Sequence, residues 1–114
     1  MRAKIFSALI LAVILCSAVS AASVPSVTML STKTCPACEQ MESVLKELNS
    51  KYKGRVSTVH IYLEDKPELA KQYNLRYVPM LIFKDASGKE AAREVGYRSV
   101  DEVMKIFAKA GVKI

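Results

Sequence analysis

The sequence is poor in cysteine, histidine and tryptophan, and these shortages exclude several classes of protein. The chain of 114 residues has three cysteines, one histidine and no tryptophan. Small exported disulfide scaffolds carry several bridges and structural zinc sites take four ligands, so neither class fits so few cysteines. A chain of this length forms one domain at most, and no repeat, low-complexity segment or linker divides it.

The sequence also lacks any run of basic residues, although positive charge exceeds negative charge. It has 17 lysines and arginines against 11 acidic residues, a formal net charge of +6. Apart from Arg2 and Lys4, the basic residues are spread from Lys33 to Lys113, which indicates a solvated surface. We therefore expect no nucleic-acid partner and, at most, a preference for anionic partners.

Only the N-terminus carries a long apolar run. A basic start is followed by apolar residues from Ile5 to about Cys16 and by small residues up to Ala22, which is the three-part pattern of a secretory signal. The run is shorter than the roughly 20 residues that a membrane-spanning helix needs. We predict a signal peptide over residues 1–22 and one domain over residues 23–114. The product would be periplasmic or otherwise extracytoplasmic, or anchored to the membrane if the signal stays uncleaved.

Two cysteines would remain after cleavage, Cys35 and Cys38, in the stretch "STKTCPACEQ". A single C-x-x-C motif fits a redox couple, half of a metal site or a structural bridge. A loop this short gains little closure entropy from a bridge, so a purely stabilising role is poorly motivated. Soft thiolates do select Cu(I), which keeps a metal-binding module open as an alternative.

Hydrophobic periodicity and turn residues predict seven elements after the signal. The expected strands are residues 27–30, residues 56–63, "YVPMLIFKD" and "AAREVGY", the last two joined by the turn "ASGKE". The expected helices are one from Pro36 with the apolar stripe Met41, Val44, Leu45 and Leu48, a short one through Gln72 capped by Asp65 with Glu68, and one from a Ser99–Glu102 capping box to Gly111. The order β-α-β-α-β-β-α predicts an α/β fold with a central mixed sheet flanked by helices.

The C-x-x-C motif falls where the first strand gives way to the first helix. Pro36 suits the first helical position, where its missing N–H is not needed. Unpaired backbone N–H groups and the positive end of the helix dipole would then face the Cys35 sulfur and favour its thiolate, the form that attacks disulfides. Cys38 lies one turn further on the same face and would be more buried. We predict that Cys35 is the nucleophile and that Cys38 resolves the mixed disulfide.

The position of the motif, together with "RYVPMLIFKDASGKEAAREVGY", resembles the thioredoxin family over almost the whole mature chain. The resemblance implies a thioredoxin-like fold in which Pro79 is a cis proline opposite the cysteines. It also implies that Val78 offers its backbone to an extended substrate and that Gly96 lines the same groove, where a side chain would block the partner. Thr34 and Tyr97 would border this substrate groove.

The chain departs from the family pattern around the cysteines. Thr34 stands where cytoplasmic thioredoxins usually have tryptophan, and Pro36 and Ala37 replace glycine and proline between the cysteines. Such residues bear on the reduction potential, so the direction of exchange is open.

A second departure concerns the proton of Cys38. The buried acidic residue of the family corresponds to Met29, and a nearby lysine to His60 or its neighbour. The proton must therefore pass through water, Glu64 or His60. Strand alternation equally allows His60 to be a half-exposed sheet residue with no role in the chemistry.

These patterns predict an exported enzyme, a protein-disulfide oxidoreductase of the thioredoxin type. Other exported members of the family are often reductants fed with electrons across the membrane, so we favour a reductase. A disulfide oxidase and a Cu(I) or other metal-binding module are the alternatives. We expect a monomer with no metal and no cofactor beyond the Cys35–Cys38 disulfide. Its partners would be protein thiols and disulfides and a membrane or periplasmic electron donor.

Overall fold

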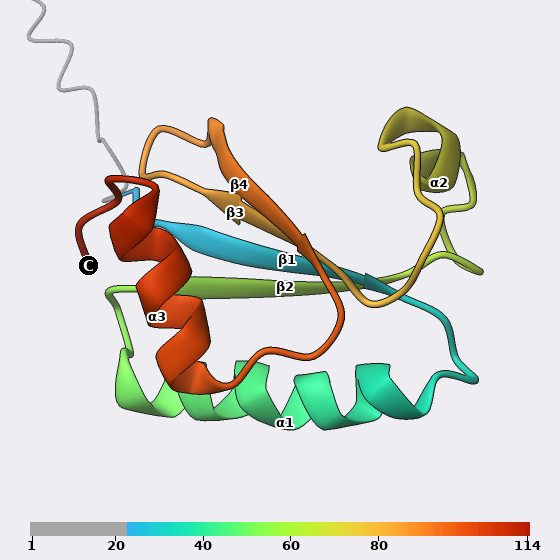
Figure 1. Ribbon diagram of the computed structural model, residues 1–114, viewed down its shortest axis with the longest axis horizontal. Coiled ribbons are helices and arrows are strands. Elements are labelled where there is room, and N and C mark those ends of the chain that lie inside the picture. Colours follow the sequence, from blue (N-terminus) through green and yellow to red (C-terminus); the bar gives the residue numbers. More distant parts are fainter. Residues whose placement is uncertain (1–22) are drawn as a thin grey trace, which may run out of the picture.

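A computed structural model describes residues 23–114, which form four strands and three helices in the predicted order (Figure 1). The predicted signal peptide lies outside the described residues. The elements are β1 (Ser26–Ser31), α1 (Pro36–Lys51), β2 (Ser57–Tyr62), α2 (Glu68–Gln72), β3 (Met80–Lys84), β4 (Glu90–Val95) and α3 (Val100–Lys109). The prediction of an α/β fold with this order of elements is confirmed.

The four strands form one mixed sheet in the order β2-β1-β3-β4. β1 pairs in parallel with β2 and antiparallel with β3, and β3 pairs antiparallel with β4. The helix α1 connects the parallel pair and lies along one face of the sheet beside α3, whereas α2 lies at the other side (Figure 1). The described chain therefore has helices on both faces of the sheet.

Strand alternation divides the apolar residues between the two faces. Val27 and Met29 of β1 point toward α1 and α3 and belong to the larger core, while Leu30 belongs to a smaller core on the other face. The predicted stripe of α1 is confirmed, since each of its four residues is buried in the larger core. Against it pack Phe83 of β3 and Phe107 of α3, edge to face with ring centroids 5.1 Å apart. Two fully buried rings thus tie the last helix to the sheet.

The helix starts test the capping predictions. The capping box of Ser99 and Glu102 is present at the start of α3, as predicted. The predicted cap of α2 is wrong, because Pro67 occupies the N-cap position and no side chain caps that helix. Asp65 instead lies beside Lys33, with 3.5 Å between carboxylate and ammonium. Its carboxylate therefore pairs with the loop after β1 rather than with a helix start.

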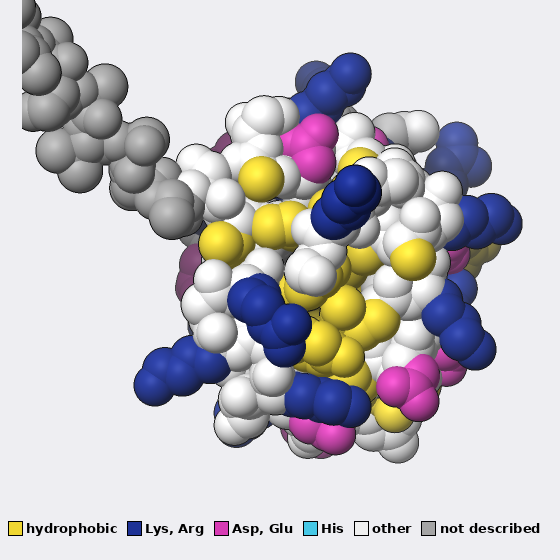
Figure 2. Space-filling view, turned by 90° about the vertical axis from the view of Figure 1, so that its left-hand side faces the viewer, with side chains coloured by type: hydrophobic (Ala, Val, Ile, Leu, Met, Phe, Trp, Pro, Cys, Tyr) yellow, Lys and Arg dark blue, Asp and Glu magenta, His cyan; other side chains and the backbone are white. Residues whose placement is uncertain are grey.

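The end of the molecule where α3 and the C-terminus lie exposes apolar side chains (Figure 2). A groove of about 530 Å³ there is lined partly by Met104, Ala108 and Val112. It lies at the opposite end of the sheet from the start of α1 (Figure 1). Within residues 23–114, no helix has both the length and the apolar character that crossing a membrane requires.

Candidate functional site

The sheet register brings three separate loops to one end of the sheet. Leu30, near the end of β1, pairs with Met80, the first residue of β3. Met80 in turn pairs with Val95, the last residue of β4. The loop that leads into α1, the loop that precedes β3 and the loop that follows β4 therefore emerge side by side (Figure 1). They carry the cysteines, Pro79 and Gly96, respectively.

Cys35 and Cys38 are joined by a disulfide at the very start of α1, with their Cα atoms 5.2 Å apart. Cys35 is the N-cap residue and Pro36 the first helical residue, as predicted. The Cys38 N–H donates to Cys35 Sγ at 3.1 Å. This N–H belongs to the first helical turn and has no carbonyl partner within the helix, so it points at the Cys35 sulfur as it would toward an anion in that place.

The two cysteines differ in their access to solvent. Cys38 is only 3% exposed, whereas Cys35 is half-buried. Thr34 and Pro36 are exposed beside Cys35, and Ala37 is half-buried. A partner's disulfide can therefore reach the Cys35 sulfur more easily than the Cys38 sulfur.

A small cavity of about 70 Å³ adjoins the disulfide on the side of β2. The lining residues come from three parts of the chain: the loop after β1, the first turns of α1, and β2. They are Thr32, Lys33, Cys35, Cys38, Glu39, Glu42, His60 and Tyr62. Of these, the sequence singled out only the two cysteines and His60.

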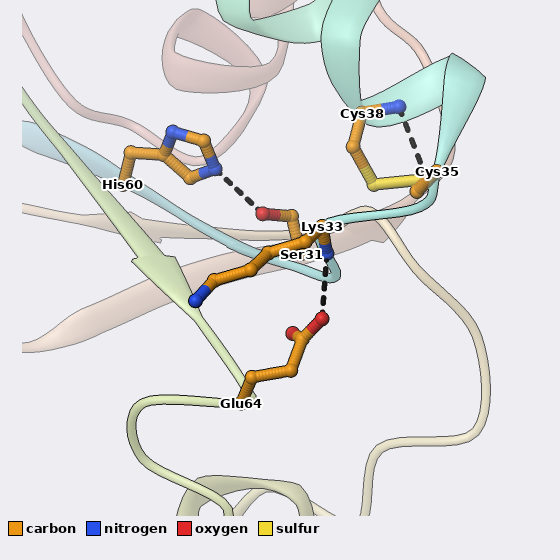
Figure 3. Close-up of a disulfide and its surroundings, with 6 residues drawn as sticks. All are labelled: Ser31, Lys33, Cys35, Cys38, His60 and Glu64. Atoms are coloured by element: carbon orange, nitrogen blue, oxygen red, sulfur yellow. Dashed lines mark hydrogen bonds between the residues drawn. A yellow bond between two sulfur atoms is a disulfide. The ribbon is translucent and has the colours of Figure 1, made fainter.

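His60 is half-buried, and its ring is held in place by Ser31. Its Nε2 shares a hydrogen bond with Ser31 Oγ, which Figure 3 shows between the imidazole and the disulfide. The ring also lies against Tyr62, with centroids 4.4 Å apart. Sequence reasoning missed Ser31. The available signal was its position two residues after Met29, on the same face at the end of a buried strand.

Met29, at the position of the family's buried acid, and Glu64, the other residue considered for the Cys38 proton, lie elsewhere. Met29 is fully buried in the larger core. Glu64 accepts a hydrogen bond from the backbone N–H of Lys33 at 2.8 Å and is not among the cavity residues (Figure 3). Its carboxylate joins the loop after β1 to the loop after β2.

The loop before β3 contains Pro79, which is fully buried and follows a cis Val78–Pro79 peptide bond. The Gly96 N–H donates to the Pro79 carbonyl at 2.8 Å, so the loop after β4 is fastened to this one. Gly96 has φ +98°, a conformation that residues with a side chain rarely adopt. Tyr97 beside it is 44% exposed, and Tyr77 is 71% exposed. An apolar, accessible surface therefore borders these two loops.

Metal ligands are few around the cysteines. Within residues 23–114, no group of three or more histidine, cysteine, aspartate or glutamate side chains is arranged to hold a metal ion. The cysteines alone supply two soft sulfur ligands, a set suited to Cu(I) rather than to structural zinc.

Comparison with known proteins relates the chain to thioredoxins. Over 63 residues it is 36% identical to Thioredoxin C-2 of Corynebacterium nephridii, covering 54% of this chain and 56% of that protein. Over 76 residues it is 33% identical to a thioredoxin of Chlamydia trachomatis serovar D, covering 66% of this chain and 72% of the relative. The chain thus spans little more than half the length of the first relative.

A solved structure and a family model extend the relationship beyond these segments. A malarial protein of known structure superposes with a TM-score of 0.71 and covers 78% of this chain and 99% of its own, at 20% identity. That likeness shows the shared fold. The model of the thioredoxin-like domain matches residues 16–111, which is most of the sequence. The chain therefore belongs to the thioredoxin-like family.

Proposed function

We propose that this chain is an exported thiol–disulfide oxidoreductase that exchanges the Cys35–Cys38 couple with protein partners, acting as a reductase. The observation that carries the proposal is the Cys35 sulfur, accessible at a helix start and facing a backbone N–H at 3.1 Å. When the disulfide is reduced, the same N–H and the helix dipole stabilise a thiolate at Cys35. Membership of the thioredoxin-like family supports this chemistry.

Exchange would proceed in two steps. The Cys35 thiolate attacks one sulfur of the partner's disulfide, forming a mixed disulfide and releasing the other sulfur as a thiolate. The Cys38 sulfur then attacks Cys35 Sγ, which re-forms the Cys35–Cys38 bond and releases the second sulfur of the partner. The partner gains two electrons and the couple loses two, so an electron donor must reduce the couple again. For an exported protein that donor would be in the membrane or the periplasm.

The partner would lie across the three loops at this end of the sheet. The backbone of Val78 would pair with an extended segment, and Pro79, Gly96 and Tyr97 would continue the surface. Thr34 borders it on the side of the cysteines. The protein would act as a monomer, since this surface is completed within one chain.

Substitution of each cysteine tests the two roles. Cys35→Ser should abolish reduction of a protein disulfide, whereas Cys38→Ser should retain the first attack and accumulate covalent mixed disulfides. Ser43→Ala, an exposed position on the same helix, serves as the control and should behave as the wild type. Full reducing activity of Cys35→Ser would overturn the proposal.

The reduction potential of the couple tests the direction. A value near about −270 mV, as in thioredoxin, agrees with a reductase. A value near about −120 mV would indicate the disulfide oxidase instead.

A further inference from the structure

We propose that His60, whose imidazole is held by Ser31, takes up the proton of Cys38 when Cys38 resolves the mixed disulfide. This inference rests on the proposed oxidoreductase function and assigns the residues that handle its proton. Cys38 is 3% exposed, so its thiol has little direct access to bulk water. A proton acceptor inside the protein is therefore needed at the step in which Cys38 becomes the nucleophile.

The placement of the pair follows from the register of the two parallel strands. Met29 of β1 is paired with His60 of β2, so these residues point to the same face of the sheet, the face that α1 covers. Ser31 lies two residues after Met29 and shares that face. Ser31 is fully buried, and its Oγ bonds to His60 Nε2 (Figure 3). The hydroxyl thus fixes the orientation of the imidazole.

The cavity beside the disulfide supplies the path for the proton. His60 and Cys38 both line it, and its volume of about 70 Å³ has room for about two water molecules. The Cys38 proton would reach the imidazole through these waters. Ser31 is not among the lining residues and acts as a positioning residue, since its hydroxyl holds the ring through Nε2.

Other charged or titratable groups face the same cavity. Lys33 comes from the loop after β1, Glu39 and Glu42 from α1, and Tyr62 from β2. Carboxylates are weaker bases toward a thiol than imidazole is, and lysine and tyrosine carry their protons at neutral pH. Imidazole changes its charge nearest to neutral pH, so it can accept a proton and later return it.

The chemical step balances without any further reagent. The Cys38 S–H proton is transferred through water in the cavity to His60, and the Cys38 thiolate attacks Cys35 Sγ. The Cys35–Cys38 bond forms as the bond from Cys35 to the partner breaks. The partner leaves as a thiolate, and the imidazolium of His60 returns its proton to this thiolate or to solvent.

The two steps can be observed separately with the chromogenic disulfide dithiobis-nitrobenzoate in a stopped-flow experiment. The reduced protein releases a first coloured thiolate on attack by Cys35 and a second on attack by Cys38. His60→Gln should leave the first release unchanged and slow the second by roughly 100-fold, the lower end of general acid–base contributions. The pH profile of the second release, from about pH 5 to 9, should lose the inflection that the imidazole gives to the wild type. Ser31→Ala leaves the ring without its hydrogen bond and should also slow the second release.

Glu64→Gln is the matched control, because Glu64 lies two residues after β2, bonds to the Lys33 N–H and is not among the cavity residues. It should release both thiolates as the wild type does. A wild-type second release in His60→Gln would overturn the inference, and one in Ser31→Ala would overturn the positioning role of Ser31. If circular dichroism shows that neither variant folds, a pH profile of the wild type without an inflection would refute proton uptake by His60. A wild type that releases no thiolate would instead refute the proposed function.

Discussion

Replacement of Gly96 by alanine should destabilise the protein through backbone strain rather than through a clash. Gly96 has φ +98°, and a Cβ built there would meet only Arg98 Nη1, at 3.6 Å, an ordinary contact with a flexible side chain. The left-handed region costs a residue with a side chain about 1–2 kcal/mol. With a urea m-value of about 2 kcal/mol/M, the midpoint of unfolding should fall by about 0.5–1 M.

Gly88 provides a matched control in the β3–β4 turn, away from the three loops at the site. It has φ +87°, and a Cβ there would meet nothing within 4 Å. Gly88→Ala should therefore lower the free energy of unfolding by a similar amount, about 1–2 kcal/mol. The two variants should differ in disulfide exchange. Only Gly96→Ala places a methyl group on the proposed substrate surface, so only it should raise the KM for a protein disulfide.

Equilibrium urea unfolding of the oxidised proteins, followed by circular dichroism, measures both free energies. If Gly96→Ala is as stable as the wild type, the strain argument is wrong. If Gly96→Ala is destabilised much more than Gly88→Ala, the added methyl group does clash with a neighbouring residue, and the expectation of an ordinary contact is wrong. An unchanged KM would mean that Gly96 serves the backbone of the loop and not the substrate surface.

Three further predictions concern the core, the cap of α3 and the metal alternative. Phe107→Ala removes a fully buried ring packed on Phe83 and should cost about 3–5 kcal/mol in urea unfolding; a loss below about 1 kcal/mol would contradict this packing role. Hydrogen bonds from Ser99 lower the pKa of Glu102 from its ordinary 4.5. The ionised carboxylate therefore stabilises the folded state above pH 4.5, and this stabilisation is lost as acid protonates it. Glu102→Gln should therefore lower Tm at neutral pH and lose this difference in acid; equal Tm values at neutral pH would refute it. Titration of the reduced protein with Cu(I) should give no binding tighter than micromolar, and tighter binding would favour the metal-binding module.

Most of the fold was predictable because its elements are encoded locally. The stripe of α1 repeats at helical spacing, and the Ser99–Glu102 box is a short motif whose geometry needs no tertiary contact. The cap of α2 was mispredicted because Asp65 satisfies the cap motif but pairs with Lys33, a residue far away in the sequence. A choice between a local and a long-range partner cannot be read from the local pattern alone.

The site shows the same difference between residues placed by local patterns and residues placed by long-range contacts. Cys35, Pro36 and Cys38 lie within four consecutive residues, so spacing alone placed them at a helix start with the right order of burial. The bond between Ser31 and His60 joins residues 29 positions apart. It depends on the register of β1 against β2, which neither strand's alternation specifies. The sequence therefore raised His60 as a candidate without finding its partner.

The register also explains how a minimal domain can handle a proton without a buried charge. A carboxylate at position 29 would lie in the larger core, where an ionised group is costly unless it is paired. Met29 keeps that position apolar. Ser31 lies two residues nearer the end of the sheet, and His60 lies level with Met29 on the edge strand β2. Ser31 satisfies the imidazole there, and the small cavity opens beside Cys38. Proton transfer at the edge of the core, rather than within it, leaves the packing of the sheet against α1 intact.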